Sequence, residues 1–117
     1  MGMEIKKIEN VWIKRSIDRM NLIDSHVLHV NVTLSNGVRY AIFFEKPEGK
    51  TLPIIKKVNV LTSYLLPKGA SIKDHFDMIN KYRLSDDIQL KIEQQLLSHK
   101  SIRMKAFFLP QTIKNKK

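Results

Sequence analysis

Cationic and aromatic side chains alternate near the C-terminal end of the chain, between positions 102 and 109. Arg103, Lys105 and Phe107 occupy every second position, so in an extended strand all three project from one face. Cations contact phosphates and aromatic rings stack on unpaired bases, a combination typical of surfaces that bind single-stranded nucleic acid. Further phosphate contacts are expected from lysines elsewhere in the chain, namely Lys56, Lys57 and Lys100. We therefore predict nucleic-acid binding through these six residues.

The net charge favours the same interpretation. Lys and Arg number 21 against 11 Asp and Glu, which gives +10 at pH 7. Residues 46–73 hold six basic groups and one acid, and residues 94–117 hold six basic groups and no acid. A surface that joined these two segments would attract RNA or DNA. The same charge suits solubility alone, or docking on an acidic protein surface, so a protein–protein adaptor or inhibitor is the alternative.

Sequence motifs of common catalytic sites are absent. The chain has no glycine-rich phosphate loop, no GxSxG motif and no cysteine. A small metal-independent ribonuclease is the third hypothesis, because Arg, Lys, His and Tyr side chains can supply the proton transfers and the charge that RNA cleavage needs. Residues of those types are Arg39, Tyr40, His99, Lys100 and Arg103. Nothing in their spacing shows that they converge, so we expect a non-enzymatic protein with no catalytic residues.

Two further binding motifs are weak. The predicted helices over 72–82 and 86–99 are spaced like a helix-turn-helix, but the second helix would begin with two aspartates, which repel phosphates. His26 and His29 lie three positions apart in a predicted strand, so they face opposite sides and cannot share a metal ion. We expect neither a metal site nor a cofactor.

The clearest structural signal is a β-hairpin over residues 26–45. Apolar residues alternate with polar ones from His26 to Leu34 and again from Val38 to Phe44. A three-residue loop over 35–37 pairs Leu34 with Val38 and brings both apolar sets to one face. Gly37 then occupies the left-handed position that such loops need. The opposite face of this hairpin is half polar.

Helices are predicted from apolar residues at helical spacing and from capping residues. The spacing favours helices over 51–66, 72–82 and 86–99, with Ser71 and Ser85 as caps of the last two. The Ile and Val content of the first of these segments also suits a strand. The helix over 72–82 is expected to bury one apolar stripe, made of Ile72, Phe76, Ile79 and Tyr82.

Alternating side chains predict two more strands. Segment 9–18 has this pattern, with a short helix as its alternative, and segment 102–109 is predicted to be the closing strand. The expected fold is therefore α+β, an antiparallel sheet built on the central hairpin with two to three helices packed on one face and a C-terminal strand. We expect one domain over residues 1–110, followed by a basic solvated tail over residues 111–117.

The distribution of apolar residues gives no sign of a membrane segment. No stretch reaches the ~20 apolar residues of a spanning helix, and charged residues interrupt the N-terminal region where a secretory signal would have its apolar core. Together with the absence of cysteine, these features predict a cytoplasmic protein without a membrane partner.

Overall fold

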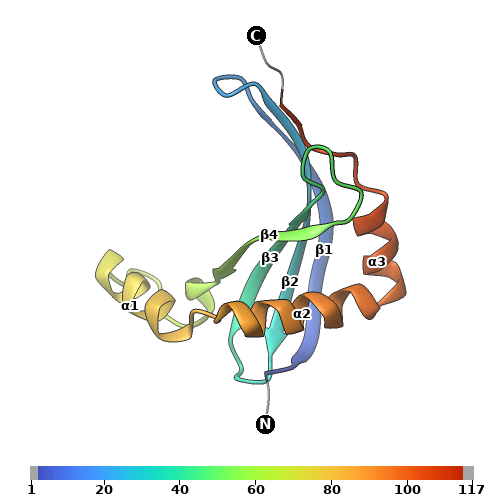
Figure 1. Cartoon of the computed structure of the whole chain (residues 1–117). Helices are drawn as coiled ribbons and strands as arrows, with labels where there is room; N and C mark the ends of the chain where they lie inside the picture. The colour runs from blue at the N-terminus through green and yellow to red at the C-terminus, as the bar shows by residue number, and fades with distance from the viewer. Residues whose placement is uncertain (1–2, 115–117) are drawn as a thin grey trace.

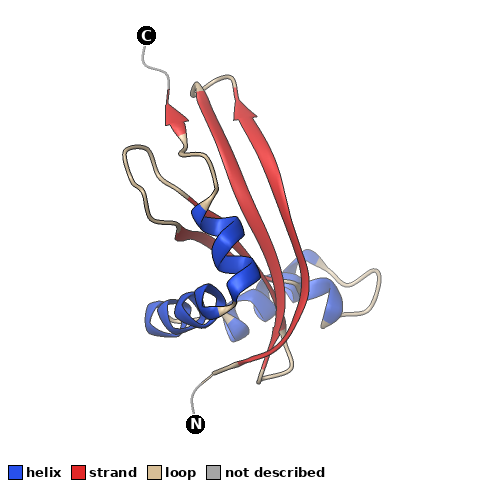
Figure 2. Ribbon diagram, turned by 90° about the vertical axis from the view of Figure 1, so that its right-hand side faces the viewer, coloured by secondary structure: helices blue, strands red, loops and turns tan. Residues whose placement is uncertain are grey.

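The computed structural model describes residues 3–114 and has the predicted α+β fold. Four antiparallel strands follow one another in the order β1-β2-β3-β4, and helices α2 and α3 pack on one face of the sheet (Figures 1 and 2). The elements in chain order are β1 (Ile5–Asp18), β2 (Ile23–Leu34), β3 (Arg39–Glu45), β4 (Ile54–Val60), the 3₁₀ helix η1 (Thr62–Tyr64), α1 (Ile72–Tyr82), α2 (Asp86–Ser98), α3 (Lys100–Phe107) and β5 (Ile113–Lys114).

The hairpin between β2 and β3 has the predicted register. Val32 pairs with Tyr40 and Val30 pairs with Ile42, which places their side chains on the same face. The loop has three residues, and it closes with a hydrogen bond from the Leu34 amide to the Val38 carbonyl at 3.1 Å. Gly37 has a φ of 80°, so the predicted left-handed position is confirmed.

The core lies between the hairpin face and the two helices. Tyr40, Ile42 and Phe44 on β3 are fully buried, and they meet Ile92 and Leu96 of α2. The buried residues contributed by β2 are Leu28, Val30, Val32 and Leu34, and those contributed by α3 are Ile102 and Ala106. Because alternate side chains of a strand face opposite sides, the other face of this sheet takes its residues from the intervening positions. We call this second surface the outer face.

The predicted helix over 51–66 is wrong, because residues 54–60 form strand β4 and only residues 62–64 form a short 3₁₀ helix. The pairing of β3 with β4 shifts between Phe43 and Phe44, so one residue of β4, Lys56, bulges out of register. The bulge separates the inward residues Ile55 and Val58 by three positions instead of two. This spacing imitates one turn of a helix, which explains the error.

The predicted strand over 102–109 is also wrong, because residues 100–107 form helix α3. Ile102 and Ala106 are buried four positions apart, as expected for one side of a helix. Met104 and Phe108 were expected to face the core, but they are 48% and 80% exposed. The helix is more stable here than the predicted strand, because it buries Ile102 and Ala106 against the core while its lysines and arginine stay in solvent.

Helices α1 and α2 begin where the capping residues predict. The Ser71 hydroxyl accepts a hydrogen bond from the Asp74 amide at 3.1 Å, and the Ser85 hydroxyl accepts one from the Ile88 amide at 3.3 Å. The predicted buried stripe of α1 is wrong, however, because no residue of this helix is buried. Figure 1 shows the reason: α1 projects beyond the β4 edge, away from the face that α2 and α3 cover.

Part of the segment expected to be a solvated tail belongs to the sheet. Thr112 is buried, and its amide donates a hydrogen bond to the Lys46 carbonyl at 2.7 Å. Ile113 and Lys114 pair with β2, so the short C-terminal strand is β5. The rest of the expected tail, residues 115–117, lies outside the described residues.

Candidate functional site

A row of aromatic side chains crosses the outer face of the sheet. Trp12 of β1 pairs with His29 of β2, and His29 pairs with Phe43 of β3. The Trp12 and His29 rings are stacked, with centroids 4.9 Å apart and planes 15° apart. The Phe43 ring meets His29 edge to face, with centroids 4.6 Å apart. On β4 the row ends at Lys57, the register partner of Phe43. Three rings and a cation thus lie side by side on neighbouring strands.

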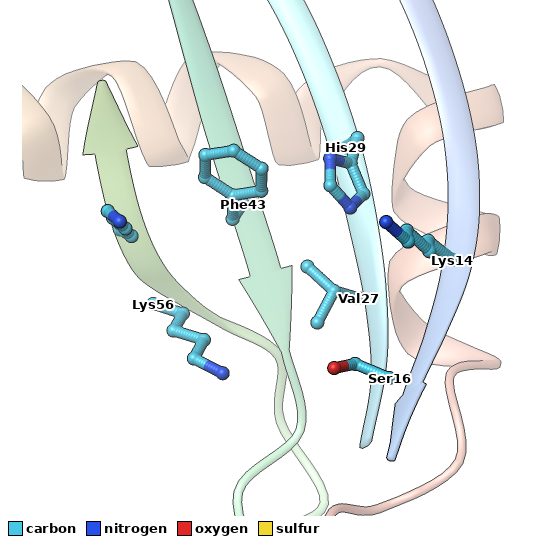
Figure 3. Close-up of a pocket in the computed structure, with 7 residues that line it drawn as sticks. Lys14, Ser16, Val27, His29, Phe43 and Lys56 are labelled. Carbon is cyan, nitrogen blue, oxygen red and sulfur yellow. The ribbon is translucent and has the colours of Figure 1, made fainter. Parts of the chain in front are cut away.

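Lysines border a shallow hollow next to this row. The hollow has a volume of about 280 Å³, and Figure 3 shows Lys14, His29, Phe43 and Lys56 reaching toward it from four neighbouring strands, with helices behind the sheet. Its full lining is Lys14, Ser16, Val27, His29, Phe43, Lys56 and Lys57. No acidic side chain lines it, so a ligand in the hollow would meet cations and aromatic rings together with Ser16 and Val27.

Some cations of the outer face form an ion pair with an acidic side chain, and others do not. Lys56 lies 3.6 Å from a Glu45 oxygen, so its charge is partly neutralised. Lys14 and Lys57 make no ion pair with any residue between 3 and 114. These two lysines flank the aromatic row on opposite sides of the hollow, and they are the cations best placed to contact a bound anion.

A second cation–aromatic pair lies farther along the outer face. The Arg39 guanidinium is 4.2 Å from the centroid of the Tyr64 ring, and it lies 3.7 Å from a Glu9 oxygen. The Tyr64 ring is 61% exposed. This pair provides another flat surface for a planar group, although Glu9 neutralises much of the arginine's charge.

The protonation state of His29 follows from its surroundings. Partial burial lowers the pKa of the imidazole below its ordinary value of 6.5, and the nearby positive charge of Lys14 lowers it further. The ring is therefore neutral at neutral pH. A neutral imidazole between Trp12 and Phe43 continues the aromatic surface instead of adding a charge to it.

Asparagines form a second row directly beside the aromatic one. Asn10 pairs with Asn31, Asn31 pairs with Ala41, and Ala41 pairs with Asn59. Within the described part of the chain, none of the three amide side chains makes a hydrogen bond to another residue. Each amide can donate and accept, as the edges of nucleic-acid bases require.

The six residues predicted from sequence to bind nucleic acid do not form one surface. Lys56 and Lys57 lie on the outer face, beside the hollow. Lys100 and Lys105 line a groove with Ile13, whose side chain is on the helix-covered face of the sheet. Arg103 and Phe107 lie on α3 as well, so the expected alternation along a strand does not exist.

The residues proposed for a ribonuclease do not form one site. His99, Lys100 and Arg103 lie together at the start of α3, where the Arg103 amide donates a hydrogen bond to the His99 carbonyl at 2.8 Å, but Arg39 and Tyr40 lie elsewhere. Tyr40 is fully buried, and its hydroxyl donates a hydrogen bond to the Tyr82 carbonyl at 2.7 Å. Arg39 lies on the outer face, whereas Lys100 lies in the groove beside α3 on the opposite side of the sheet. The structure brings no two of these three together at one site.

Sequence reasoning missed Lys14, Trp12, His29 and Phe43. The Trp12 side chain is 42% exposed on the outer face. The signal for Phe43 and His29 was present, because the hairpin register already places them opposite each other on the half-polar face. Trp12 joins them only through the pairing of β1 with β2, which has two irregularities that no pattern in the sequence indicates.

A comparison with protein-family models, curated proteins and solved structures finds no match to this chain. In residues 3–114, no helix is both long enough and apolar enough to cross a lipid bilayer. Inferences about function therefore rest on the geometry of the outer face.

Proposed function

We propose that this protein binds single-stranded nucleic acid on the outer face of its sheet, as a non-enzymatic binding protein. The observation that carries the proposal is the row Trp12–His29–Phe43, which is flanked by the unpaired cations Lys14 and Lys57. Exposed aromatic rings beside cations are what unpaired bases and their phosphates need from a protein surface.

Stacking would take place at the two ends of the row. Trp12 and Phe43 are on strands separated by β2, and neighbouring strands lie ~4.8 Å apart, so their backbones are about 10 Å apart. This distance allows one base on each ring, with His29 between them. Each stacked base contributes about 1–3 kcal/mol in proteins of this kind. A duplex keeps its bases stacked on one another and cannot use these rings, so single strands should bind better.

Phosphate contacts would come from the borders of the hollow. Lys14 and Lys57 are free to approach the backbone, whereas Lys56 would first have to leave Glu45. For single strands, each neutralised phosphate contributes about −0.7 to the slope of log affinity against log salt. Two contacts therefore predict a slope of roughly −1.4. The three asparagines beside the row would hydrogen-bond base edges, which gives the surface a means to prefer some bases over others.

The experiment is an anisotropy titration of labelled single-stranded RNA, single-stranded DNA and duplex of the same length at low salt. Trp12→Ala and Phe43→Ala are each expected to weaken single-strand binding by about tenfold, which corresponds to the loss of one stacked base. Phe107→Ala is the matched control, because Phe107 is an exposed aromatic residue on α3, away from the outer face.

The outcomes distinguish a wrongly placed binding site from a wrong class of function. Equal binding by wild type and Trp12→Ala, with a loss in Phe107→Ala, would move the site to α3. Absence of binding to any of the three nucleic acids at low salt would reject nucleic-acid binding altogether.

A further inference from the structure

The Arg39–Tyr64 pair lies toward the end of the outer face that is opposite the hollow. On β3 the residues that face this side are Arg39, Ala41 and Phe43, at every second position. A strand rises ~3.3 Å per residue, so Arg39 is about 13 Å from Phe43 along β3. Ala41 and the row of asparagines lie between them. A ligand that lay over Phe43 could therefore continue along the sheet to the Arg39–Tyr64 pair.

The backbone holds Tyr64 beside the start of β3. The Leu61 amide donates a hydrogen bond to the Arg39 carbonyl at 2.9 Å, which fixes the short helix η1 at this position. The Arg39 guanidinium lies over one face of the Tyr64 ring, 4.2 Å from its centroid. Tyr64 is nevertheless 61% exposed, so the rest of the ring is open to a planar partner. A ring already held in place loses little conformational entropy when a base stacks on it.

Glu9 holds Arg39 over the ring. One Glu9 carboxylate oxygen lies 3.7 Å from the Arg39 guanidinium and 3.7 Å from the Lys7 ammonium. The other oxygen accepts a hydrogen bond from the Thr33 hydroxyl at 3.3 Å. The Glu9 side chain is only 13% exposed, so it is a fixed anchor for both cations. Two cations share one carboxylate, and one positive charge therefore remains for a bound phosphate.

This cluster has the same two components as the aromatic row, namely an exposed ring and a cation that is not fully neutralised. We infer that the Arg39–Tyr64 pair is a further base-stacking subsite, which a single strand reaches after it has crossed the row Trp12–His29–Phe43. The inference rests on the proposed function and names its class of ligand. That ligand is a single strand long enough to span both clusters, and not a free nucleotide or a dinucleotide.

The test compares labelled uridine-only strands of two and of twelve nucleotides in anisotropy titrations at low salt. A strand of two nucleotides has only the bases that Trp12 and Phe43 take up. Tyr64→Ala is therefore expected to weaken binding of the longer strand about tenfold, the loss of one stacked base, and to leave binding of the shorter strand unchanged. Trp12→Ala should weaken both. Phe108→Ala is the matched control, because Phe108 is an exposed aromatic residue on the helix-covered side of the sheet.

Two variants of Arg39 distinguish stacking from charge. Lysine keeps the positive charge but not the planar guanidinium, so Arg39→Lys should weaken binding of the longer strand severalfold without changing the slope of log affinity against log salt. Arg39→Ala should also flatten that slope by about 0.7, the contribution of one phosphate contact. Arg39 and Tyr64 are both accessible to solvent, so all three variants should keep the thermal midpoint and circular dichroism of wild type.

The outcomes distinguish failure of the subsite from failure of the proposed function. Unchanged binding of the longer strand by Tyr64→Ala, together with a loss in Trp12→Ala, would overturn the subsite and leave the proposed function standing. An equal loss for both strand lengths would also overturn it, because Tyr64 would then act through the fold. Wild type that binds neither strand would reject the proposed function, and the subsite with it.

Discussion

The indole of Trp12 lies against the imidazole of His29, with ring centroids 4.9 Å apart and planes inclined by 15°. The pair joins the edge strand β1 to β2 on the face of the sheet opposite α2 and α3. Phe43 extends it to β3, and Lys57 extends it to β4. A surface made of one side chain from each of four strands depends on correct pairing of the whole sheet, so binding should be lost when the sheet unfolds.

The first prediction concerns the salt dependence of binding. The double variant Lys14→Ala/Lys57→Ala should flatten the plot of log affinity against log salt by about 1.4 for single strands, because two phosphate contacts are removed. The measurement is a series of anisotropy titrations at several salt concentrations.

The matched control for that slope is Lys100→Ala/Lys105→Ala, which removes the same charge from the groove beside α3. It should leave the slope close to that of wild type. A slope that changes in the control and not in the outer-face variant would assign the phosphate contacts to α3.

The second prediction concerns pH. The pKa of His29 lies below 6.5 in the free protein, because burial and Lys14 disfavour its charged form. A phosphate bound near the ring would raise this pKa, so binding takes up a proton and affinity should increase as the pH falls from about 7.5 to about 5.5. The measurement uses a uridine-only strand, whose bases do not gain protons in this range. Binding by the His29→Phe variant should lose this increase. An unchanged pH profile would show that His29 is not at the interface.

The third prediction concerns the hairpin loop. Gly37→Val should lower the free energy of unfolding by about 1 kcal/mol or more, since Gly37 has a φ of 80° and a β-branched residue resists this conformation. Gly37→Asn should cost less, because asparagine tolerates the left-handed region. Urea unfolding checks both variants. Equal midpoints for valine and wild type would contradict the loop geometry.

The fourth prediction compares how a charge on each face of β2 changes the stability of the protein. Val32 is fully buried, so Val32→Asp should destabilise the protein by about 3–5 kcal/mol through an unpaired buried charge. Asn31, its neighbour on the outer face, is partly exposed, and Asn31→Asp should change stability by less than about 1 kcal/mol. The same Asn31→Asp variant should weaken nucleic-acid binding, since it places a negative charge beside the aromatic row.

The parts of the fold that depend on local chemistry were predictable from sequence. The register of β2 with β3 follows from alternation and from Gly37, and the starts of α1 and α2 follow from Ser71 and Ser85. These features involve residues close together in the chain, where sterics and hydrogen bonds leave few alternatives.

The parts that depend on distant contacts were not predictable. The bulge at Lys56 gives β4 the spacing of a helix, and only its pairing with β3 shows it to be a strand. The spacing of Ile102 and Ala106 fits both the alternation of a strand and one side of a helix. Only their packing against the core shows that the segment is a helix. The candidate site depends on the same long-range pairing, because β1 supplies Trp12 through a register with two irregularities. The charge of the chain favoured a polyanionic ligand, which stays a prediction, and it did not indicate which surface would bind one.

The most direct test of the outer face uses Trp12 itself, the only tryptophan in the chain. Its fluorescence reports on the proposed stacking site without any label. Titration of single-stranded oligonucleotide at low salt should quench this fluorescence in step with the anisotropy signal, and added salt should restore it. Phe43→Ala should shift the quenching curve to higher nucleic-acid concentration. Binding seen by anisotropy with no change in Trp12 fluorescence would contradict the proposed site, because a base stacked on the indole cannot leave its emission unchanged.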